Sequence, residues 1–560
     1  MPHSRARRLR FIVAIAGAAT ILASTALPAA AANKSGFKTK QAAMLDAAHA
    51  SVDKIVPLIT VGERKGGYRF EAIPDGISFR TRGNGRVDVY VNHETSTVPF
   101  PYTAYAPANP GATPPTAERF PTKDNSQNDF DNSQLSRLVL NRKSKGILSG
   151  KLVIRSDENY QRFCSNYMAT AKEGFDRPIL FTGEETPDTV NRDGVAWPAT
   201  PAFGSNPEQA GLVVAYDVKT GARKPIYGMG RHNHENNVAI PGFASLVMLS
   251  GDDTFTSNPP QSQLYAYIAP NTDAVWNDTG ELYGFKATDP AINDYYDVPV
   301  GSTTPVPGTF VKINKSDAVR DQTVLESASD ALGVFQFVRL EDIAYDKRPG
   351  MSNVIYIADT GRGLAPVPPA TTAPAGSSTN GRIWKLVLDP LDPTKGSLSV
   401  FVEGDDDQVK APNEIHQPDN LETTRNGLYV TEDPGSSQQF AFGSTDTAAT
   451  TARVWKVALD GLSKDIVLKV NQGADEGPTD VDPSGKGNLG LWEASGIIDA
   501  SAAFGPGWFF VDVQAHSLWV QKDETSAPDL SGPGNVPDGV PDWTYKREGG
   551  QLLLVHIQGG

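Results

Sequence analysis

Three features are scarce in this 560-residue sequence: cysteine, positive charge and long apolar runs. The single cysteine, Cys164, excludes a disulfide framework. The formal net charge of -14 argues against binding to nucleic acid, which needs a basic face. Beyond the leader, no apolar run is long enough to span a membrane. An acidic surplus ordinarily serves solubility, but many carboxylates here lie beside apolar segments, which favours cation binding.

The first 32 residues have the pattern of a signal peptide. Arg5 to Arg10 form a basic region, an apolar stretch follows, and residues 29–32 offer an Ala-x-Ala cleavage site. The pair Arg7-Arg8 is also a partial twin-arginine signal, so either the general or the twin-arginine export route is open. We therefore expect a secreted, extracellular protein whose mature chain, residues 33–560, is a single catalytic domain.

Sustained helical periodicity is also scarce, and only residues 40–56 predict a helix. Instead, six apolar runs each end in acidic or histidine residues, and each follows another polar cluster by roughly 12 to 20 residues. Three to four short strands per repeat, six times over, predict an all-β fold, a six-bladed β-propeller with loop insertions and little helix. A pair of large β-sandwiches is the alternative. The six runs are residues 87–91, 179–181, 246–249, 354–357, 427–430 and 508–511.

Loops and the C-terminal strand complete this expected architecture. Insertions rich in Pro, Gly, Ser, Thr or Asn at residues 99–132, 364–381 and 435–450 are predicted to be surface loops that wall an active site. Residues 551–555 are predicted to form a strand that closes the ring.

The acidic clusters at the strand ends predict a metal site. The innermost strands of a propeller converge near its axis, and many carboxylates meeting there could not all ionise without cations. Carboxylates suit Ca²⁺, whereas a thiolate among them suits a softer ion such as iron or zinc. The expected metal ligands are Glu94, Cys164, Glu184, Glu185, Glu235, Asp252, Glu341 and Glu432.

Two arginines and two histidines accompany these acids. Arg231 and Arg339 are expected to be catalytic, because guanidinium groups bind phosphate bidentately. His93 and His234, by contrast, are more often hydrogen-bonded to carbonyls than bound to metal. Any single acid at a strand end is more often a turn former than a ligand, and a lone cysteine is more often a small buried hydrophobe. The recurrence of the same polar pattern in all six repeats is what favours the metal site.

The order of these motifs resembles the PhoX-type alkaline phosphatases over most of the mature chain. The resemblance implies a six-bladed propeller, exported by the twin-arginine route, that hydrolyses phosphate monoesters with a calcium and iron (Fe³⁺) cluster. It puts Cys164, Glu235 and Glu341 on the metals and Arg339 on the phosphate, and extends to Glu94, Glu185 and Asp252. The motifs are Asn92-His93-Glu94, Cys164 followed by Glu184-Glu185, Gly230-Arg231-x-x-His234-Glu235, Gly251-Asp252-Asp253, Arg339-x-Glu341-Asp342 and Pro418-Asp419-Asn420-Leu421.

The expected reaction uses metal ions to neutralise the phosphoryl oxygens while the arginines hold them. The expected partners are small-molecule phosphate esters, with no nucleic acid and no membrane span, and the protein is expected to be a monomer. Two alternatives stay open. One is a Ca²⁺-dependent propeller hydrolase without iron that acts on phytate, phosphodiesters or lactones. The other is a non-catalytic, calcium-stabilised propeller.

Overall fold

A computed structural model describes most of the chain between Ser35 and Gly560, which forms one compact unit. The predicted signal peptide, most of the three predicted surface loops and most residues between 475 and 548 lie outside the described part. The described ranges are residues 35–71, 73–94, 133–158, 160–187, 189–190, 208–257, 259–362, 380–404, 413–433, 450–474, 492–515, 518–521, 543–546 and 549–560.

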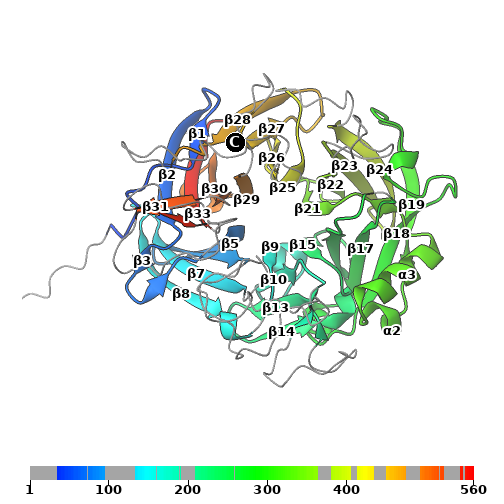
Figure 1. Ribbon diagram of the computed structural model, residues 1–560. Coiled ribbons are helices and arrows are strands. Elements are labelled where there is room, and N and C mark those ends of the chain that lie inside the picture. Colours follow the sequence, from blue (N-terminus) through cyan, green and yellow to red (C-terminus); the bar gives the residue numbers. More distant parts are fainter. Residues whose placement is uncertain are drawn as a thin grey trace, which may run out of the picture. The chain divides into compact units, whose positions relative to one another are not determined.

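Antiparallel sheets make up this unit (Figure 1). The first sheet has the order β5 (Pro74–Arg82), β6 (Arg86–His93), β7 (Gln134–Asn141) and β8 (Ile147–Ile154). The second contains β9 (Phe163–Ala169), β10 (Ile179–Glu184), β13 (Val213–Asp217) and β14 (Arg223–Ile226). A five-stranded sheet contains β25 (Pro418–Thr423), β26 (Leu428–Glu432), β27 (Arg453–Val457), β28 (Lys464–Val470) and β1 (Leu45–Ala47). Another contains β29 (Glu493–Asp499), β30 (Trp508–Ala515), β33 (Gly549–Ile557) and β2 (Val52–Thr60).

A ten-stranded sheet lies between the second and the five-stranded sheets in sequence. One half runs through β15 (His234–Ile240), β16 (Leu246–Asp252), β17 (Ser262–Ala269), β18 (Glu281–Ala287) and β19 (Val306–Lys312). The other half runs through β21 (Leu340–Tyr345), β22 (Val354–Asp359), β23 (Arg382–Asp389) and β24 (Asp392–Glu403), and β19 pairs with β24. The short β20 (Gln336–Phe337) pairs with β17. Two-stranded ribbons join β3 (Arg64–Lys65) to β4 (Tyr68–Arg69), β11 (Thr189–Val190) to β12 (Glu208–Gln209), and β31 (Leu518–Gln521) to β32 (Trp543–Lys546).

The sheets have a propeller-like arrangement. Strands β5, β9, β15, β21, β25 and β29 lie nearest the common centre in Figure 1, and each contacts the next in this cyclic order, with β29 contacting β5. The apolar runs predicted from the sequence are the second strands β6, β10, β16, β22, β26 and β30. Apolar side chains fill the space between sheets, and Trp384 and Trp455 are fully buried there. The all-β prediction is therefore confirmed.

The predicted helix over residues 40–56 is wrong, because this segment forms β1 and the beginning of β2. Strand β1 pairs with β28, and β2 pairs with β33, which also pairs with β30. Val52, Leu58 and Ile59 are buried by this pairing. Tertiary pairing with two late segments of the chain decided the structure, and a local pattern cannot report such pairing. The predicted strand over residues 551–555 lies within β33.

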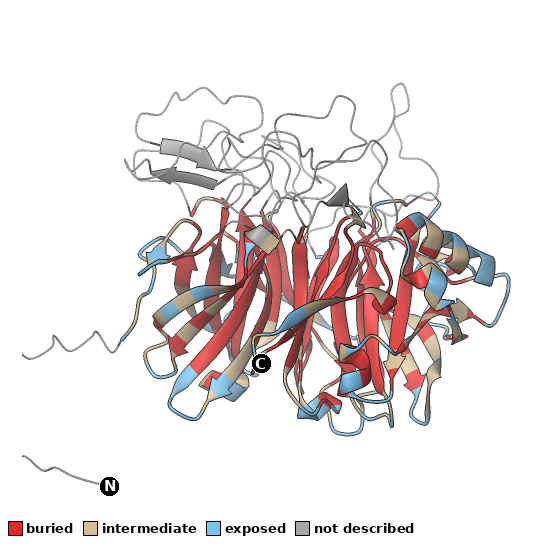
Figure 2. Ribbon diagram, turned by 90° about the horizontal axis from the view of Figure 1, so that it is seen from below, coloured by how far each residue is buried: buried red, intermediate tan, exposed pale blue. Residues whose placement is uncertain are grey.

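The described residues contain four short α-helices: α1 (Thr272–Trp276), α2 (Lys315–Ala318), α3 (Gln322–Leu332) and α4 (Ser501–Phe504). In the described part of the chain, no helix is long and apolar enough to cross a membrane. Figure 2 shows that buried residues follow the strands, while exposed residues gather at the connections between them.

Candidate metal centre

The same irregularity occurs near the start of each strand that faces the centre. In each of these strands two residues lie opposite one residue of the second strand, which makes a β-bulge. Such bulges re-aim side chains next to functional sites. The first residue of each bulge is Asp75, Cys164, Glu235, Glu341, Asp419 or Ser495.

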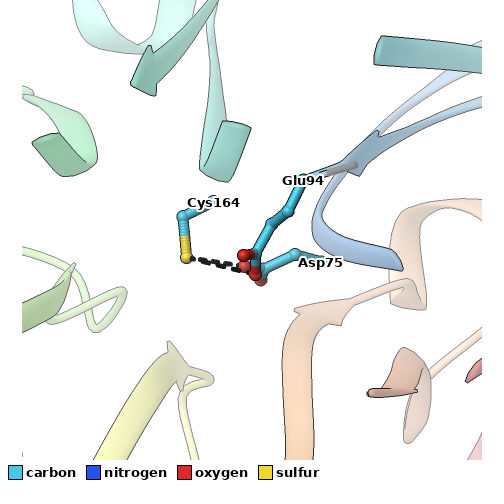
Figure 3. A group of neighbouring side chains, drawn as sticks. All are labelled: Asp75, Glu94 and Cys164. Carbon is cyan, nitrogen blue, oxygen red and sulfur yellow. Dashed lines mark hydrogen bonds between the residues drawn. The ribbon is translucent and has the colours of Figure 1, made fainter. Parts of the chain in front are cut away.

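These bulges bring together residues that are far apart in the sequence. The Sγ atom of Cys164 lies 2.7 Å from Oδ2 of Asp75 and 4.0 Å from Oε1 of Glu94 (Figure 3). Two groups of donors, Asp75 with Glu94 and Cys164, and Cys164 with Glu185 and Glu235, each have ligand atoms within 4.8 Å of one another. All five residues are buried. Cys164 belongs to both groups, so the thiol is the point around which the carboxylates gather.

A second set of side chains comes from the second strands. In each second strand one residue pairs with the residue just before the bulge, and the residue that follows it belongs to this set. These residues are Glu94, Glu185, Asp253, Thr360, Asp433 and Gln514. Gln514 donates to Oε1 of Glu94 over 2.9 Å, and Thr360 donates to Oε1 of Glu341 over 3.1 Å. The sixfold repetition therefore supplies two rings of polar groups from the ends of adjacent strands.

Two arginines link these rings. Arg162 and Arg339 each come directly before a strand that faces the centre and have φ values of 45° and 62°. This left-handed conformation is uncommon for a residue with a side chain and is found where the surrounding structure imposes it. Nε of Arg162 lies 3.1 Å from Oε2 of Glu94 and 2.9 Å from Oε2 of Glu185.

Arg339 makes corresponding contacts with other carboxylates of the rings. It donates to both oxygens of Asp253 over 2.9 and 2.8 Å, and to Oε1 of Glu341 over 2.7 Å. Its Nη1 atom lies 3.7 Å from Asp433. Each arginine is thus held in place by two or more carboxylates that belong to the rings.

Burial and mutual repulsion raise the pKa of several acids of the centre, among them Glu185, Glu235 and Glu341. The pKa of Glu235 is well above its usual value because of burial and the charges of Glu341 and Glu185. Burial also raises the pKa of the Cys164 thiol, and the charge of Asp75 adds to this effect. Oε1 of Glu235 is buried without a hydrogen-bond partner. A bound cation would let these groups ionise and would satisfy this oxygen, so the donor set fits a metal centre that mixes hard oxygen ligands with one soft sulfur.

The structure brings together five of the eight predicted metal ligands around the centre. Glu94, Cys164, Glu185 and Glu235 make up the two groups of donors, and Glu341 is near enough for its charge to raise the pKa of Glu185 and Glu235. The carboxylate of Glu341 is also the neighbour that most strongly raises the pKa of Glu235 after burial itself.

The structure does not bring the other three predicted ligands, Glu184, Asp252 and Glu432, into the centre. Each pairs with the residue just before the bulge of the facing strand, one residue before the side chain that enters the second ring. Glu184 accepts from the backbone of Gln161 and Leu212. Since neighbouring residues of a strand point to opposite faces, these three acids point away from the residues that follow them.

Glu432 and Asp252 are likewise engaged elsewhere. Glu432 is paired with Arg453 over 2.8 Å and also accepts from the indole of Trp455. Asp252 accepts from Thr254 over 2.9 Å. Glu184, Asp252 and Glu432 thus lie outside the two groups of donors, contrary to the expectation from the sequence, and we do not include them in the ligand set that we propose.

Arg231, which we expected to be catalytic, is also placed away from the centre. Its side chain is completely buried, donates to the carbonyl oxygen of Gln209 and pairs with Glu208 over 3.0 Å. Its partners belong to β12, outside the two rings. Arg162, in contrast, contacts Glu94 and Glu185 of the centre.

Sequence reasoning missed Asp75 and Arg162. The polar cluster that precedes residues 87–91 was the one precursor not identified, and Asp75 lies there, in the Pro74-Asp75-Gly76 sequence that corresponds to Pro418-Asp419-Asn420. Arg162 occupies the same place before Cys164 that Arg339 occupies before Glu341, two residues upstream. Aligning the repeats on these positions would have found both residues.

The two histidines form hydrogen bonds, as the simpler interpretation predicted. The ring nitrogens of His93 lie 3.1 Å from the carbonyl oxygen of Glu71 and 2.7 Å from Oγ of Ser136. Those of His234 lie 2.9 Å from Oγ of Ser250 and 3.0 Å from the carbonyl oxygen of Gly230. Both rings are thereby fixed as supports of the sheet ends.

This arrangement defines a class of protein: a propeller-like chain with a buried centre that can hold metal ions and with arginines that can hold an anion. The family model for alkaline phosphatase PhoX matches residues 155–474, more than half of the chain. The chain therefore belongs to the alkaline phosphatase PhoX family and is a phosphatase, a metal-dependent hydrolase. The resemblance drawn from the motifs is confirmed. Phosphatases of this family are generally secreted and act on phosphate esters.

Solved structures share little sequence with this chain. The α-L-arabinofuranosidase Arb93A from Fusarium graminearum is 9% identical with a TM-score of 0.37, and the alignment covers 91% of this chain and 99% of that one. The NanB sialidase from Streptococcus pneumoniae is 8% identical with a TM-score of 0.36, covering 90% of this chain and 70% of that one. At these values neither similarity carries a functional argument. A search of curated proteins found no match.

Proposed function

We propose that this chain is a secreted phosphomonoesterase whose central site holds calcium and iron (Fe³⁺). The observation that carries the proposal is the placement of the chain's one cysteine thiol among buried carboxylates, two of which, Glu94 and Glu185, pair with Arg162. A thiolate is a ligand that suits iron, whereas the surrounding carboxylate oxygens suit Ca²⁺. The natural substrates are small-molecule phosphate monoesters, and the protein acts as a monomer.

The fold proposed for this function is a six-bladed propeller over residues 33–560, preceded by a signal peptide at residues 1–32. Two observations support six blades: the cyclic contacts of β5, β9, β15, β21, β25 and β29, and the bulge that recurs in each of these strands. The ten-stranded sheet then consists of two blades whose outer strands β19 and β24 pair with each other.

The metal ligands that we propose are Asp75, Glu94, Cys164, Glu185 and Glu235, with Glu341 beside them. When bound, the metal ions would neutralise phosphoryl oxygens and lower the pKa of an attacking oxygen. These residues come from the first and second sheets and from both halves of the ten-stranded sheet, so the centre requires the closed ring of strands.

The proposed role of Arg162 and Arg339 is to hold the phosphoryl group. A guanidinium group presents a planar fork of N–H donors that matches two phosphate oxygens, and it offsets the charge that builds up in the transition state. In this structure carboxylates of the rings occupy both forks. Once cations bind these carboxylates, the N–H groups of both arginines are available to a phosphoryl group.

Removal and return of metal tests this function. We expect the purified protein to contain iron and calcium, to lose phenyl phosphate hydrolysis on chelation, and to recover it when both ions are restored. Elemental analysis and a phosphatase assay measure these outcomes. A protein that contains calcium without iron and prefers phytate, phosphodiesters or lactones would support the calcium-dependent hydrolase instead. Full metal content without turnover of any ester would favour the non-catalytic propeller.

The stability of the metal-free protein is expected to fall as the pH rises. Burial raises the pKa of Glu185, Glu235 and Glu341 well above their usual value, so the folded protein keeps protons that the unfolded chain loses above about pH 4. Above about pH 4 the native state therefore binds more protons than the unfolded chain, so its free energy of unfolding decreases as the pH rises.

We expect the chelated protein to lose about 5 °C or more in Tm between pH 5 and pH 8, relative to the metal-loaded protein over the same range. Thermal unfolding of both forms at the two pH values measures this difference. Parallel changes of Tm in the two forms would show that the central carboxyl groups do not govern the pH dependence.

A further inference from the structure

An exposed aromatic residue lies next to the centre. Phe255 comes two residues after Asp253, just beyond the end of β16, and its exposed fraction of 36% places it among the large apolar side chains that face solvent. Three guanidinium groups surround its ring. The central carbon of Arg339 lies 4.7 Å from the ring centroid, and those of Arg162 and Arg362 each lie 5.7 Å from it.

The charges of the three arginines are compensated differently. Arg162 is paired with Glu94 and Glu185, and Arg339 with Asp253 and Glu341. Arg362 donates to the carbonyl oxygen of Phe255, and within the described part of the chain it forms no ion pair with a carboxylate. It is half-buried. This burial and the positive charge of Arg339 lower its pKa, while the charge of Asp253 acts in the opposite direction.

The structure therefore holds Arg362 close to Arg339, against the repulsion between their positive charges, although no carboxylate of the described residues forms an ion pair with Arg362. A partly desolvated arginine of this kind gains most from an anionic ligand, because a charge-assisted hydrogen bond and the relief of repulsion act together. The N–H groups of Arg162 and Arg339 face the carboxylates of the rings. A phosphate group held there would therefore not use the charge of Arg362 fully. The additional positive charge at Phe255 is suited to another part of the substrate.

We infer that Arg362 and Phe255 form a subsite for a second anionic group of the substrate. The preferred substrates are then phosphate monoesters that carry a carboxylate or another phosphate near the ester bond. This inference rests on the proposed function and specifies its substrate class. Arg362 binds the second anion, and Phe255 positions Arg362 beside Arg339 through contacts with both guanidinium groups.

Binding of non-hydrolysable ligands tests the subsite separately from catalysis. The probes are phenylphosphonate and 4-carboxyphenylphosphonate, titrated calorimetrically into the metal-loaded protein. We expect the carboxylated probe to bind about tenfold more tightly, which corresponds to about 1.4 kcal/mol. Arg362→Gln should abolish this preference while changing the Kd of phenylphosphonate by less than about twofold. Arg348→Gln is the control, because Arg348 pairs with Asp346 and contacts neither Phe255 nor Arg339.

Each result decides one question. Equal affinity of the wild-type protein for both probes, or a preference that persists in Arg362→Gln, would overturn the subsite. An equal loss for both probes in Arg362→Gln would also overturn it, because Arg362 would then serve the reacting phosphoryl group. Hydrolysis of phenyl phosphate by the same preparations is measured in parallel: absence of turnover with an intact probe preference would reject the proposed function and keep the anion site.

Discussion

Replacing Cys164 by serine is expected to remove iron from the protein and to lower kcat for phenyl phosphate by about 100-fold or more. The thiol lies 2.7 Å from Asp75 and belongs to both groups of donors, so no other side chain of the two groups holds the same position. A serine hydroxyl is a hard donor that stays protonated where a thiol ionises, and it does not replace a thiolate on iron. Elemental analysis and single-substrate kinetics measure both effects.

The matched control for this substitution is Glu184→Gln. Glu184 is fully buried one residue before Glu185, and its carboxylate accepts from the backbone of Gln161 and Leu212. A glutamine can keep one of these hydrogen bonds, so we expect reduced thermal stability with unchanged metal content. Iron retained in Cys164→Ser, or lost equally in Glu184→Gln, would contradict the assignment of the thiol.

Arg339→Lys is expected to lower kcat/KM by about 100- to 1,000-fold while leaving the metal content intact. Lysine keeps the positive charge but presents a single ammonium group in place of a planar fork. In the protein this fork spans both oxygens of Asp253 and reaches Glu341. The loss should appear mainly in kcat if the fork acts on the charge that develops in the transition state. Steady-state kinetics and elemental analysis of the same preparation measure it.

Arg382→Lys controls for the loss of a buried guanidinium group. Arg382 is 2% exposed, pairs with Glu403 over 2.9 Å and donates to the carbonyl oxygen of Tyr295. This substitution should reduce thermal stability and leave kcat/KM within a few-fold of the wild-type value. If Arg339→Lys behaves like this control, Arg339 has a purely structural role.

The sequence predicted the centre more accurately than it predicted the individual ligands. In several sheets two acids follow each other at the end of the second strand, as in Glu184-Glu185 and Asp252-Asp253. A sequence pattern shows that an acid is available there but not which of the two faces the axis. The register between the second strand and the bulged strand that faces the centre decides which of the two consecutive acids points toward the axis. Asp253 was therefore overlooked in favour of Asp252.

The sequence by itself determined the all-β class and the family, and it predicted that acids and one thiol converge. Strand periodicity and the order of the motifs can both be read along the chain without knowledge of which segments pair. Only the tertiary structure decided that residues 40–56 contribute β1 and the beginning of β2, that Arg162 and not Arg231 contacts the carboxylates of the site, and that Asp75 lies against Cys164. These outcomes depend on the closure of β2 onto β33 and on the register of each bulge. Both arise from hydrogen bonds between segments that are distant in the sequence, and no local pattern encodes them.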